Sequence, residues 1–316
     1  MPRLSAAIRG PRPARVEDIP AMNEVFSDSF TDRYRRDGLV GVRVPQLNPT
    51  VWRYAIADAG EGAMVWYDDD GVVAFNMVHR SGGEGWMGPL AVRPEHQGRG
   101  LGKRIVQAGV EWLQAGGSQT IGLETMPRTV DNIGFYSGLE FVPRYLTVSL
   151  ACALPSDGVP AECMSAASDP ERVLEECRSL TSEIQPTCDF TREIRLTADL
   201  GLGDTSLVHR HGALAGFALW HSSPLAEGRA AEELRVLKLV AVDLAAFEVL
   251  IEGLMGAAGG LGLTGLSVRC QTAYPDAYRS LVRHGFQVQW TDLRMTRTGY
   301  DEPIPASGVV FSNWEI

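Results

Sequence analysis

The chain has 316 residues, 45% of them hydrophobic, so it is long enough for two domains that each bury a core. Its formal net charge of −10 argues against nucleic acid or an anionic membrane as the main partner, because both select a basic protein surface. The same acidity suits a cationic substrate such as an amine, or serves only to keep the chain dispersed in water.

The cysteines and the apolar segments of the sequence indicate in which cellular compartment the protein is expected. The five cysteines are odd in number and lack C-x-x-C spacing, which argues against a zinc site or a disulfide framework and fits a reducing cytoplasm. The first ten residues lack the apolar core of a signal peptide, and the apolar stretch 239–266 carries three carboxylates and many glycines. We therefore expect a cytoplasmic protein with no membrane partner and no metal.

Periodicity places the first half's elements in order. Helices are predicted at 18–30 and 100–114, and strands at 70–81, 84–92 and 120–126. The helix at 100–114 carries one apolar stripe that is expected to face a core, formed by Leu101, Ile105, Val106, Val110, Trp112 and Leu113. An α/β fold follows from this alternation.

The junction between the strand at 84–92 and the helix at 100–114 is a glycine-rich loop. Such a loop points several backbone N–H groups into one concavity, and the positive end of the helix dipole favours a phosphate there. Its spacing excludes two familiar phosphate loops. A Walker loop would need glycine at Gln97 and a hydroxyl residue at Arg104, and a dinucleotide fingerprint would need glycine at Lys103.

What remains, Gln97-x-x-Gly100-x-Gly102, resembles the acyl-CoA pyrophosphate loop of the GCN5-related N-acetyltransferases, the GNAT family. Downstream, Asn132-x-x-Phe135-Tyr136 is similar to the asparagine and tyrosine of that family, although Glu140 stands where glycine is usual. The resemblance covers roughly residues 5–151. It implies acetyl-CoA as co-substrate, bound by Leu90, Ala91, Val92, Gln97, Gly98, Arg99, Gly100, Leu101, Gly102, Lys103, Asn132 and Tyr136.

The resemblance also implies catalytic roles. In the family, the strand corresponding to 88–92 leaves its neighbour, and its backbone pairs with the pantetheine arm of the co-substrate. The asparagine contacts that arm, and the tyrosine hydroxyl is often placed to protonate the leaving thiolate, which is the role implied for Tyr136. Glu84 is the first candidate for the general base because it shares a strand face with Trp86, and Glu124 is the second. Each of these carboxylates could equally be a solvated residue at the end of a strand. A chain of water molecules leading to bulk solvent is another route for the proton.

The second half repeats the first. Residues 70–81 are echoed by 211–222, and residues 121–150 by 266–296. The second copy lacks the glycine loop, and Leu281 stands where Tyr136 does, so we expect it to be catalytically inactive. We predict two tandem GNAT-like domains, each a mixed, largely antiparallel sheet flanked by helices. The boundaries are 1–153 for the acyl-CoA-binding domain, 154–168 for a linker, 169–300 for the degenerate domain and 301–316 for a tail.

The tail carries large apolar side chains, so we expect it to dock. It either seals the two domains together or reaches the first domain's cleft, where Glu315 or the terminal carboxylate would act as base. The expected activity is acetyl transfer to a primary amine of a small molecule by direct attack in a ternary complex, by a monomer or a homodimer. A non-catalytic acyl-CoA-binding sensor and a protein N-acetyltransferase are the alternatives.

Overall fold

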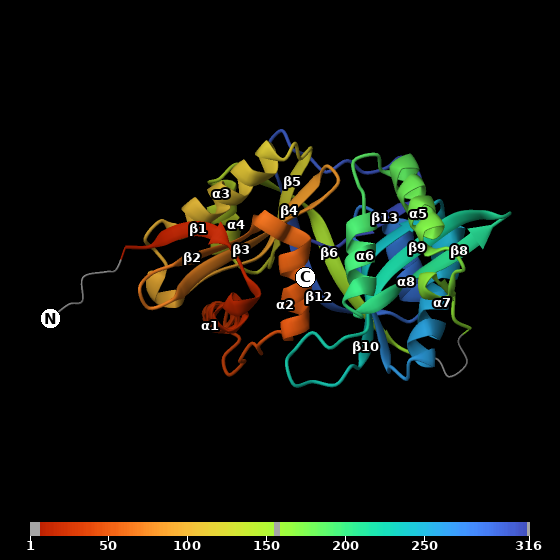
Figure 1. Ribbon diagram of the computed structural model, residues 1–316, viewed down its shortest axis with the longest axis horizontal. Helices are drawn as coiled ribbons and strands as arrows, with labels where there is room; N and C mark the ends of the chain where they lie inside the picture. Colours follow the sequence, from red (N-terminus) through yellow and green to blue (C-terminus); the bar gives the residue numbers. More distant parts are fainter. Residues whose placement is uncertain (1–6, 155–158, 315–316) are drawn as a thin grey trace.

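The computed structural model describes residues 7–154 and 159–314, which form two successive sets of elements (Figure 1). The first half contains β1 (Arg9–Pro13), α1 (Ile19–Arg36), α2 (Pro49–Ala59), β2 (Ala63–Tyr67), β3 (Val72–Ser81), β4 (Glu84–Val92), α3 (Leu101–Ala115), β5 (Thr120–Thr125), α4 (Val130–Ser137) and β6 (Phe141–Ala153). The second half contains β7 (Glu162–Cys163), α5 (Pro170–Ile184), α6 (Thr191–Asp199), β8 (Gly203–Arg210), β9 (Ala213–His221), β10 (Glu233–Ala241), α7 (Leu244–Gly260), β11 (Gly265–Gln271), α8 (Pro275–Arg283) and β12 (Gln287–Arg297), followed by β13 (Val309–Ser312).

Both halves use the same order: a strand, two helices, three strands, a helix, a strand, a helix and a final strand. The tandem arrangement predicted from the sequence is therefore confirmed. The caps explain some of the boundaries. The Asp169 carboxylate accepts a hydrogen bond from the Arg172 backbone N–H (3.1 Å) at the start of α5. Helix α1 runs to Arg36 instead of ending at residue 30, and Arg33 pairs with Asp37 along its last turn.

One hydrogen-bonded sheet runs through both halves. Its strand order is β1-β2-β3-β4-β5-β12-β6-β11-β10-β9-β8-β7, and β13 pairs with β10. Each half therefore places its last strand beside the other half: β12 pairs with β5, and β6 pairs with β11. The division of the chain at residues 154–168 remains a prediction, because it separates the sequence repeats but does not divide the sheet.

Strands β4 and β5 separate partway along their length. They are paired in parallel from Glu84 and Thr120 to Met87 and Leu123, and beyond Met87 the strand β4 is paired only with β3. The corresponding strands of the second half, β10 and β11, pair over three residues. There β13 lies against the rest of β10, from Lys238 to Ala241. Within the described ranges, the gap is thus open in the first half and filled by the tail in the second.

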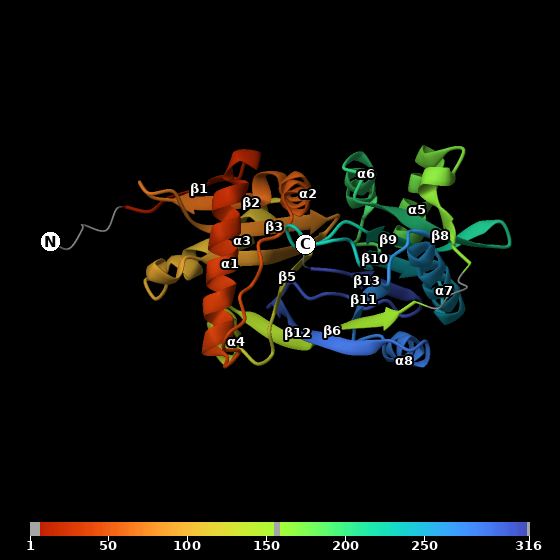
Figure 2. The same ribbon diagram turned by 90° about the horizontal axis from the view of Figure 1, so that it is seen from below.

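Helices cover both faces of the first half's sheet. Helices α1 and α2 pack against Phe75 and Met77, whereas α3 packs on the opposite face against Val78 and Met87. Successive strand residues point to opposite faces, so Met77 and Val78 enter different cores. Figure 2 shows α1 lying across the strands of this half. The predicted stripe of α3 is buried, apart from the half-buried Trp112.

Within residues 7–154 and 159–314, each helix is either too short or too polar to span a lipid bilayer.

Candidate active site

The loop between β4 and α3 has a backbone that only glycine adopts readily. Gly98 and Gly100 have φ angles of +73° and +79°, and open space surrounds the position of a side chain on each. The Gln97 side-chain amide donates a hydrogen bond to the Val92 carbonyl (2.8 Å) and holds the loop against the end of β4. No side chain in the described part of the molecule caps α3 at Gly100. The N–H groups of the first helical turn therefore remain directed at the loop, as a phosphate requires.

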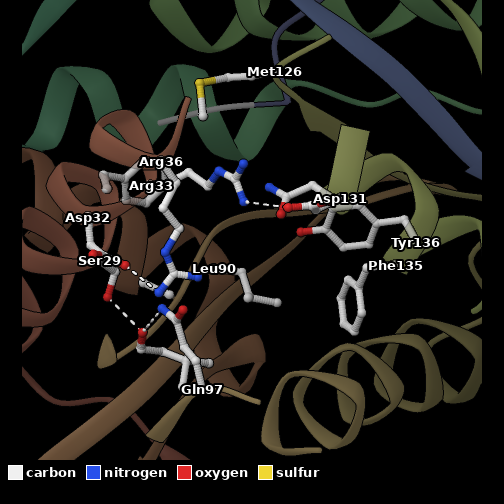
Figure 3. Close-up of a pocket in the computed structure, with 14 residues that line it drawn as sticks. Ser29, Asp32, Arg33, Arg36, Leu90, Gln97, Met126, Asp131, Phe135 and Tyr136 are labelled. Atoms are coloured by element: carbon white, nitrogen blue, oxygen red, sulfur yellow. Dashed lines mark hydrogen bonds and ion pairs between the residues drawn. The ribbon is translucent and has the colours of Figure 1, made fainter. Parts of the chain in front are cut away.

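A cavity of about 340 Å³, here named the loop cavity, adjoins this loop (Figure 3). Six of the residues predicted to bind the co-substrate line it together: Leu90, Ala91, Val92, Gln97, Asn132 and Tyr136. The other six, Gly98, Arg99, Gly100, Leu101, Gly102 and Lys103, belong to the loop and the first turn of α3 and do not line it. The Leu101 side chain is buried in the core beside α3, and Lys103 lines a separate cavity near Gly138. These two side chains do not face the loop cavity, so any contact that they make there comes from the backbone.

Tyr136 stands on α4 at the far wall of the loop cavity. Its ring packs against Phe135 and Phe141, with centroid distances of 5.1 and 6.2 Å. Figure 3 shows its hydroxyl pointing across the cavity toward Leu90. Burial raises the pKa of this hydroxyl to about 12, so it is protonated at neutral pH. Tyr136 is therefore a proton donor facing the open edge of β4.

Helix α1 adds two basic residues to the same cavity. Arg33 pairs with Asp37 and lies 3.7 Å from Asp131, and Arg36 pairs with Asp32 at 2.7 Å (Figure 3). The hydrogen bond and charge of Asp37 raise the pKa of Arg33. Both guanidinium groups thus already have carboxylate partners, which fixes their positions along the cavity wall.

A second cavity of about 410 Å³, here named the central cavity, lies where the halves meet. The two cavities share five lining residues: Phe30, Leu90, Met126, Asn132 and Tyr136. The second half and the tail contribute Leu225, Arg269, Trp290, Asp292 and Trp314. Tyr136 therefore stands at the junction of a cavity beside the glycine loop and a cavity built by both halves.

Glu84, the first candidate for the base, lines neither cavity. It begins β4, is 3% exposed, and accepts a hydrogen bond from the Ser312 hydroxyl (2.5 Å). A strand rises about 3.3 Å per residue, so Glu84 lies roughly 20 Å along β4 from Leu90. The structure places this carboxylate in the contact between β4 and the tail, and we do not retain it as the base.

Glu124, the second candidate, does lie in the wall of the central cavity. Its fully buried carboxylate forms ion pairs with Arg269 (2.5 Å) and with Arg294 (2.9 Å). Burial alone would raise its pKa, but the two guanidinium groups outweigh burial and hold the pKa below its ordinary value. A carboxylate stabilised as an anion in this way is a weak proton acceptor.

Asp292 on β12 is a cavity carboxylate that sequence reasoning missed. It is 3% exposed, lies 3.1 Å from the Arg269 guanidinium, and accepts a hydrogen bond from the Trp290 indole N–H (3.2 Å). Burial raises its pKa and outweighs the opposing charge of Arg269. No local motif marks this residue. It reaches the first half only because β12 pairs with β5.

The tail docks, as expected. Strand β13 pairs with β10, and the fully buried Trp314 beyond it lines the central cavity where the halves meet. Glu315 and the terminal carboxylate, the proposed alternative bases, lie outside the described residues.

Parts of the chain are similar in sequence to known proteins. Residues 20–141 match the model of the acetyltransferase (GNAT) family. The chain is 26% identical over 77 residues to an uncharacterized N-acetyltransferase, YobR, of Bacillus subtilis. That match covers 24% of this chain and 31% of YobR, so it spans about a third of the relative.

Solved structures resemble nearly the whole chain. A candidate acetyltransferase from Pyrococcus horikoshii superposes with a TM-score of 0.69 at 16% identity, over 99% of this chain and 96% of that one. Saccharomyces cerevisiae N-myristoyltransferase with bound myristoyl-CoA gives 0.63 at 11% identity, over 96% and 85% of the two chains. At these identities the likeness concerns the fold. The chain therefore shares its fold with these structures, and its residues 20–141 are similar to the acetyltransferase (GNAT) family.

Proposed function

We propose that the chain is an acetyl-CoA-dependent N-acetyltransferase that acetylates a primary amine of a small molecule by direct attack in a ternary complex. The observation that carries this proposal is that Tyr136 lines both cavities. A donor entering beside the glycine loop and an acceptor entering between the halves would meet at one protonated hydroxyl.

The donor would use the open edge of β4. Residues 98–102 would receive the pyrophosphate on backbone N–H groups, and Arg99 would add a positive charge beside it. The pantetheine arm would then lie along residues 90–92, whose edge toward β5 has no strand partner in the described parts of the chain. Asn132 faces this edge from α4. A backbone N–H aimed at the thioester oxygen contributes roughly 2.7–4 kcal/mol to stabilising the oxyanion.

The reaction needs no covalent enzyme intermediate. The amine nitrogen attacks the thioester carbon, the tetrahedral intermediate collapses, and sulfur leaves with the electron pair of the C–S bond. Tyr136 would give a proton to that sulfur. General-acid assistance of this kind is worth about 10²–10⁴ in rate.

The test is acetyl-CoA with a panel of small primary amines, followed by free-thiol release and by the mass of the product. Amine-dependent thiol release with an acetylated product supports the proposal. Binding of acetyl-CoA without turnover on any amine or peptide would overturn it in favour of an acyl-CoA-binding sensor. Turnover on peptide N-termini alone would overturn the assignment of a small-molecule acceptor.

A further inference from the structure

The central cavity has walls that are mainly aromatic and aliphatic. They include Phe26, Phe30 and Tyr34 of α1 and Trp290 of β12. The Tyr34 and Trp290 rings belong to different halves and approach to 6.1 Å between centroids, with their planes at 36°. Trp290 is 37% exposed, so part of its ring is available to a ligand. Such walls favour an apolar, flat molecule.

A loop of the second half contributes to the wall of this cavity. Ala226 forms a β-bridge with Leu47, and the Asn48 backbone N–H donates to the Leu225 carbonyl (2.8 Å). The Glu227 N–H donates to the Gln46 carbonyl (2.9 Å). These bonds hold Leu225 in the cavity wall. The cavity, at about 410 Å³, lies within the usual range for small-molecule sites.

Three charged side chains line the cavity where the structure describes it: Glu124, Arg269 and Asp292. Glu124 and Arg269 neutralise each other as an ion pair. Behind them, the fully buried Arg294 pairs with both Glu124 and Glu302. Asp292 also lies 3.1 Å from Arg269. Of the two carboxylates that line the described part of the cavity, Glu124 contacts two guanidinium groups and Asp292 contacts one, so Asp292 is the less neutralised.

The lining of the cavity restricts the acceptor. One ammonium group can pair with the Asp292 carboxylate. The further charges of a polyamine, or the hydroxyls of an amino sugar, would lose their hydration against Phe26, Leu225 and the other apolar walls. A buried polar group that has no hydrogen-bond partner is destabilising. An amine on an apolar body avoids this destabilisation.

We infer that the central cavity takes a primary amine carried on an apolar, aromatic body, and that the Asp292 carboxylate binds its ammonium group and accepts its proton. This inference rests on the proposed acetyltransferase function. The direction of the pKa shift at Asp292 suits the role, because a raised pKa makes the carboxylate a better proton acceptor than Glu124.

The proton balance is complete with the groups present. The ammonium gives one proton to Asp292, and the freed lone pair forms the N–C bond while the C–S bond breaks. Sulfur takes the proton of Tyr136. The nitrogen loses its second excess proton, which restores the Tyr136 hydroxyl through solvent. Asp292 then releases its proton, so that one proton leaves for each acetyl group transferred.

The inference is tested first on the wild-type protein. We expect kcat/KM for 2-phenylethylamine and tryptamine to exceed that for spermidine and glucosamine by at least about tenfold, which is 1.4 kcal/mol of transition-state binding. Binding of 2-phenylethylamine to the CoA-saturated protein, measured by calorimetry, gives a readout that needs no turnover. A preference for spermidine or glucosamine would overturn the inference.

Two variants and a control identify the residues. Asp292→Asn should raise KM for 2-phenylethylamine and lower kcat, with acetyl-CoA affinity unchanged. Trp290→Ala, at a partly exposed position, should raise KM for 2-phenylethylamine more than for ethylamine. Asp276→Asn removes the same charge from the exposed ion pair with Arg279 and should change neither parameter.

The failures are distinguishable. Absence of acetyl-CoA binding in the wild-type protein would overturn the proposed function itself. Acetyl-CoA turnover with an unchanged amine KM in both the Asp292 and Trp290 variants would overturn only the assignment of the acceptor site.

Discussion

The indole of Trp314 occupies the space that a side chain on Gly122 would need, since a Cβ atom built on Gly122 would lie 2.1 Å from a carbon of the Trp314 ring. The Arg294 guanidinium lies over the same ring, 3.8 Å from its centroid. Gly122 belongs to β5 of the first half, whereas Trp314 follows β13, which pairs in the second half. The contact therefore fastens the tail to the wall of the proposed site.

This packing predicts coupled stability effects. Gly122→Ala should lower the free energy of unfolding by about 1–3 kcal/mol through overpacking, and Trp314→Ala by about 3–5 kcal/mol through the cavity it leaves. In the double variant the new methyl group enters vacated space, so the loss should be smaller than the sum of the two single losses. Urea unfolding of the four proteins measures this coupling. Strictly additive losses would contradict the contact.

The filling of the second half's strand gap by β13 predicts one CoA site per chain. Calorimetry should give a stoichiometry of one. Gly100→Glu should weaken CoA binding at least about tenfold, because a charged side chain would stand where the phosphate approaches the backbone. Gly212→Glu is the matched control, since Gly212 shares the left-handed φ (+80°) and the open surroundings but lies in the turn between β8 and β9. Two sites, or equal weakening by both variants, would refute the assignment.

The helices and strands predicted correctly are those that contiguous sequence specifies, whereas the binding and catalytic roles of their residues remain predictions. The strand β4, the glycines around Gly100 and the amphipathic helix α3 follow one another directly in the sequence. Tyr136 lies further along the chain, on the next helix. The duplication was visible because both copies keep the same order of apolar segments. Local pattern and local structure coincide in these cases.

The composition of the central cavity could not be predicted, because it depends on the exchange of the final strands. Asp292 and Trp290 lie on β12, which pairs with β5 of the other half, and no periodicity within β12 encodes that choice of partner. The same applies to Glu84. Its position at the start of β4 is evident from sequence, but the Ser312 hydroxyl that bonds to it comes from the end of the chain.

Tyr136→Phe should lower kcat by about 10²–10⁴ and leave the affinity for CoA nearly unchanged, because the ring keeps its packing and only the hydroxyl is lost. The acid form is the active one, and its pKa is about 12. The wild-type rate should therefore show no alkaline decline from Tyr136 up to about pH 10.5. Equal losses in kcat and in CoA affinity would show that Tyr136 only lines the site and does not act as the general acid.

A last prediction concerns the contact between α6 and the first half. Glu193 is 2% exposed, accepts a hydrogen bond from the Ser81 hydroxyl, and has one carboxylate oxygen with no partner in residues 7–154 and 159–314. Burial and the nearby charge of Asp58 raise its pKa to about 7, although Lys238 and Arg192 oppose the shift.

The folded protein thus binds this proton more tightly than the unfolded chain does. The contribution of Glu193 to stability is greatest below its ordinary pKa and is lost as the pH rises to about 7. Glu193→Gln keeps an acceptor for Ser81 but removes the titration. As the pH rises from 4.5 to 7.5, the free energy of unfolding of the variant minus that of the wild type should therefore increase by about 1 kcal/mol or more. Glu175→Gln is the control, because this exposed carboxylate pairs with Arg178 and has a lowered pKa, which puts its titration below the window. Chemical unfolding at a series of pH values tests this prediction. If the free energies of unfolding of the wild type and of Glu193→Gln change in parallel with pH, Glu193 does not titrate in this range.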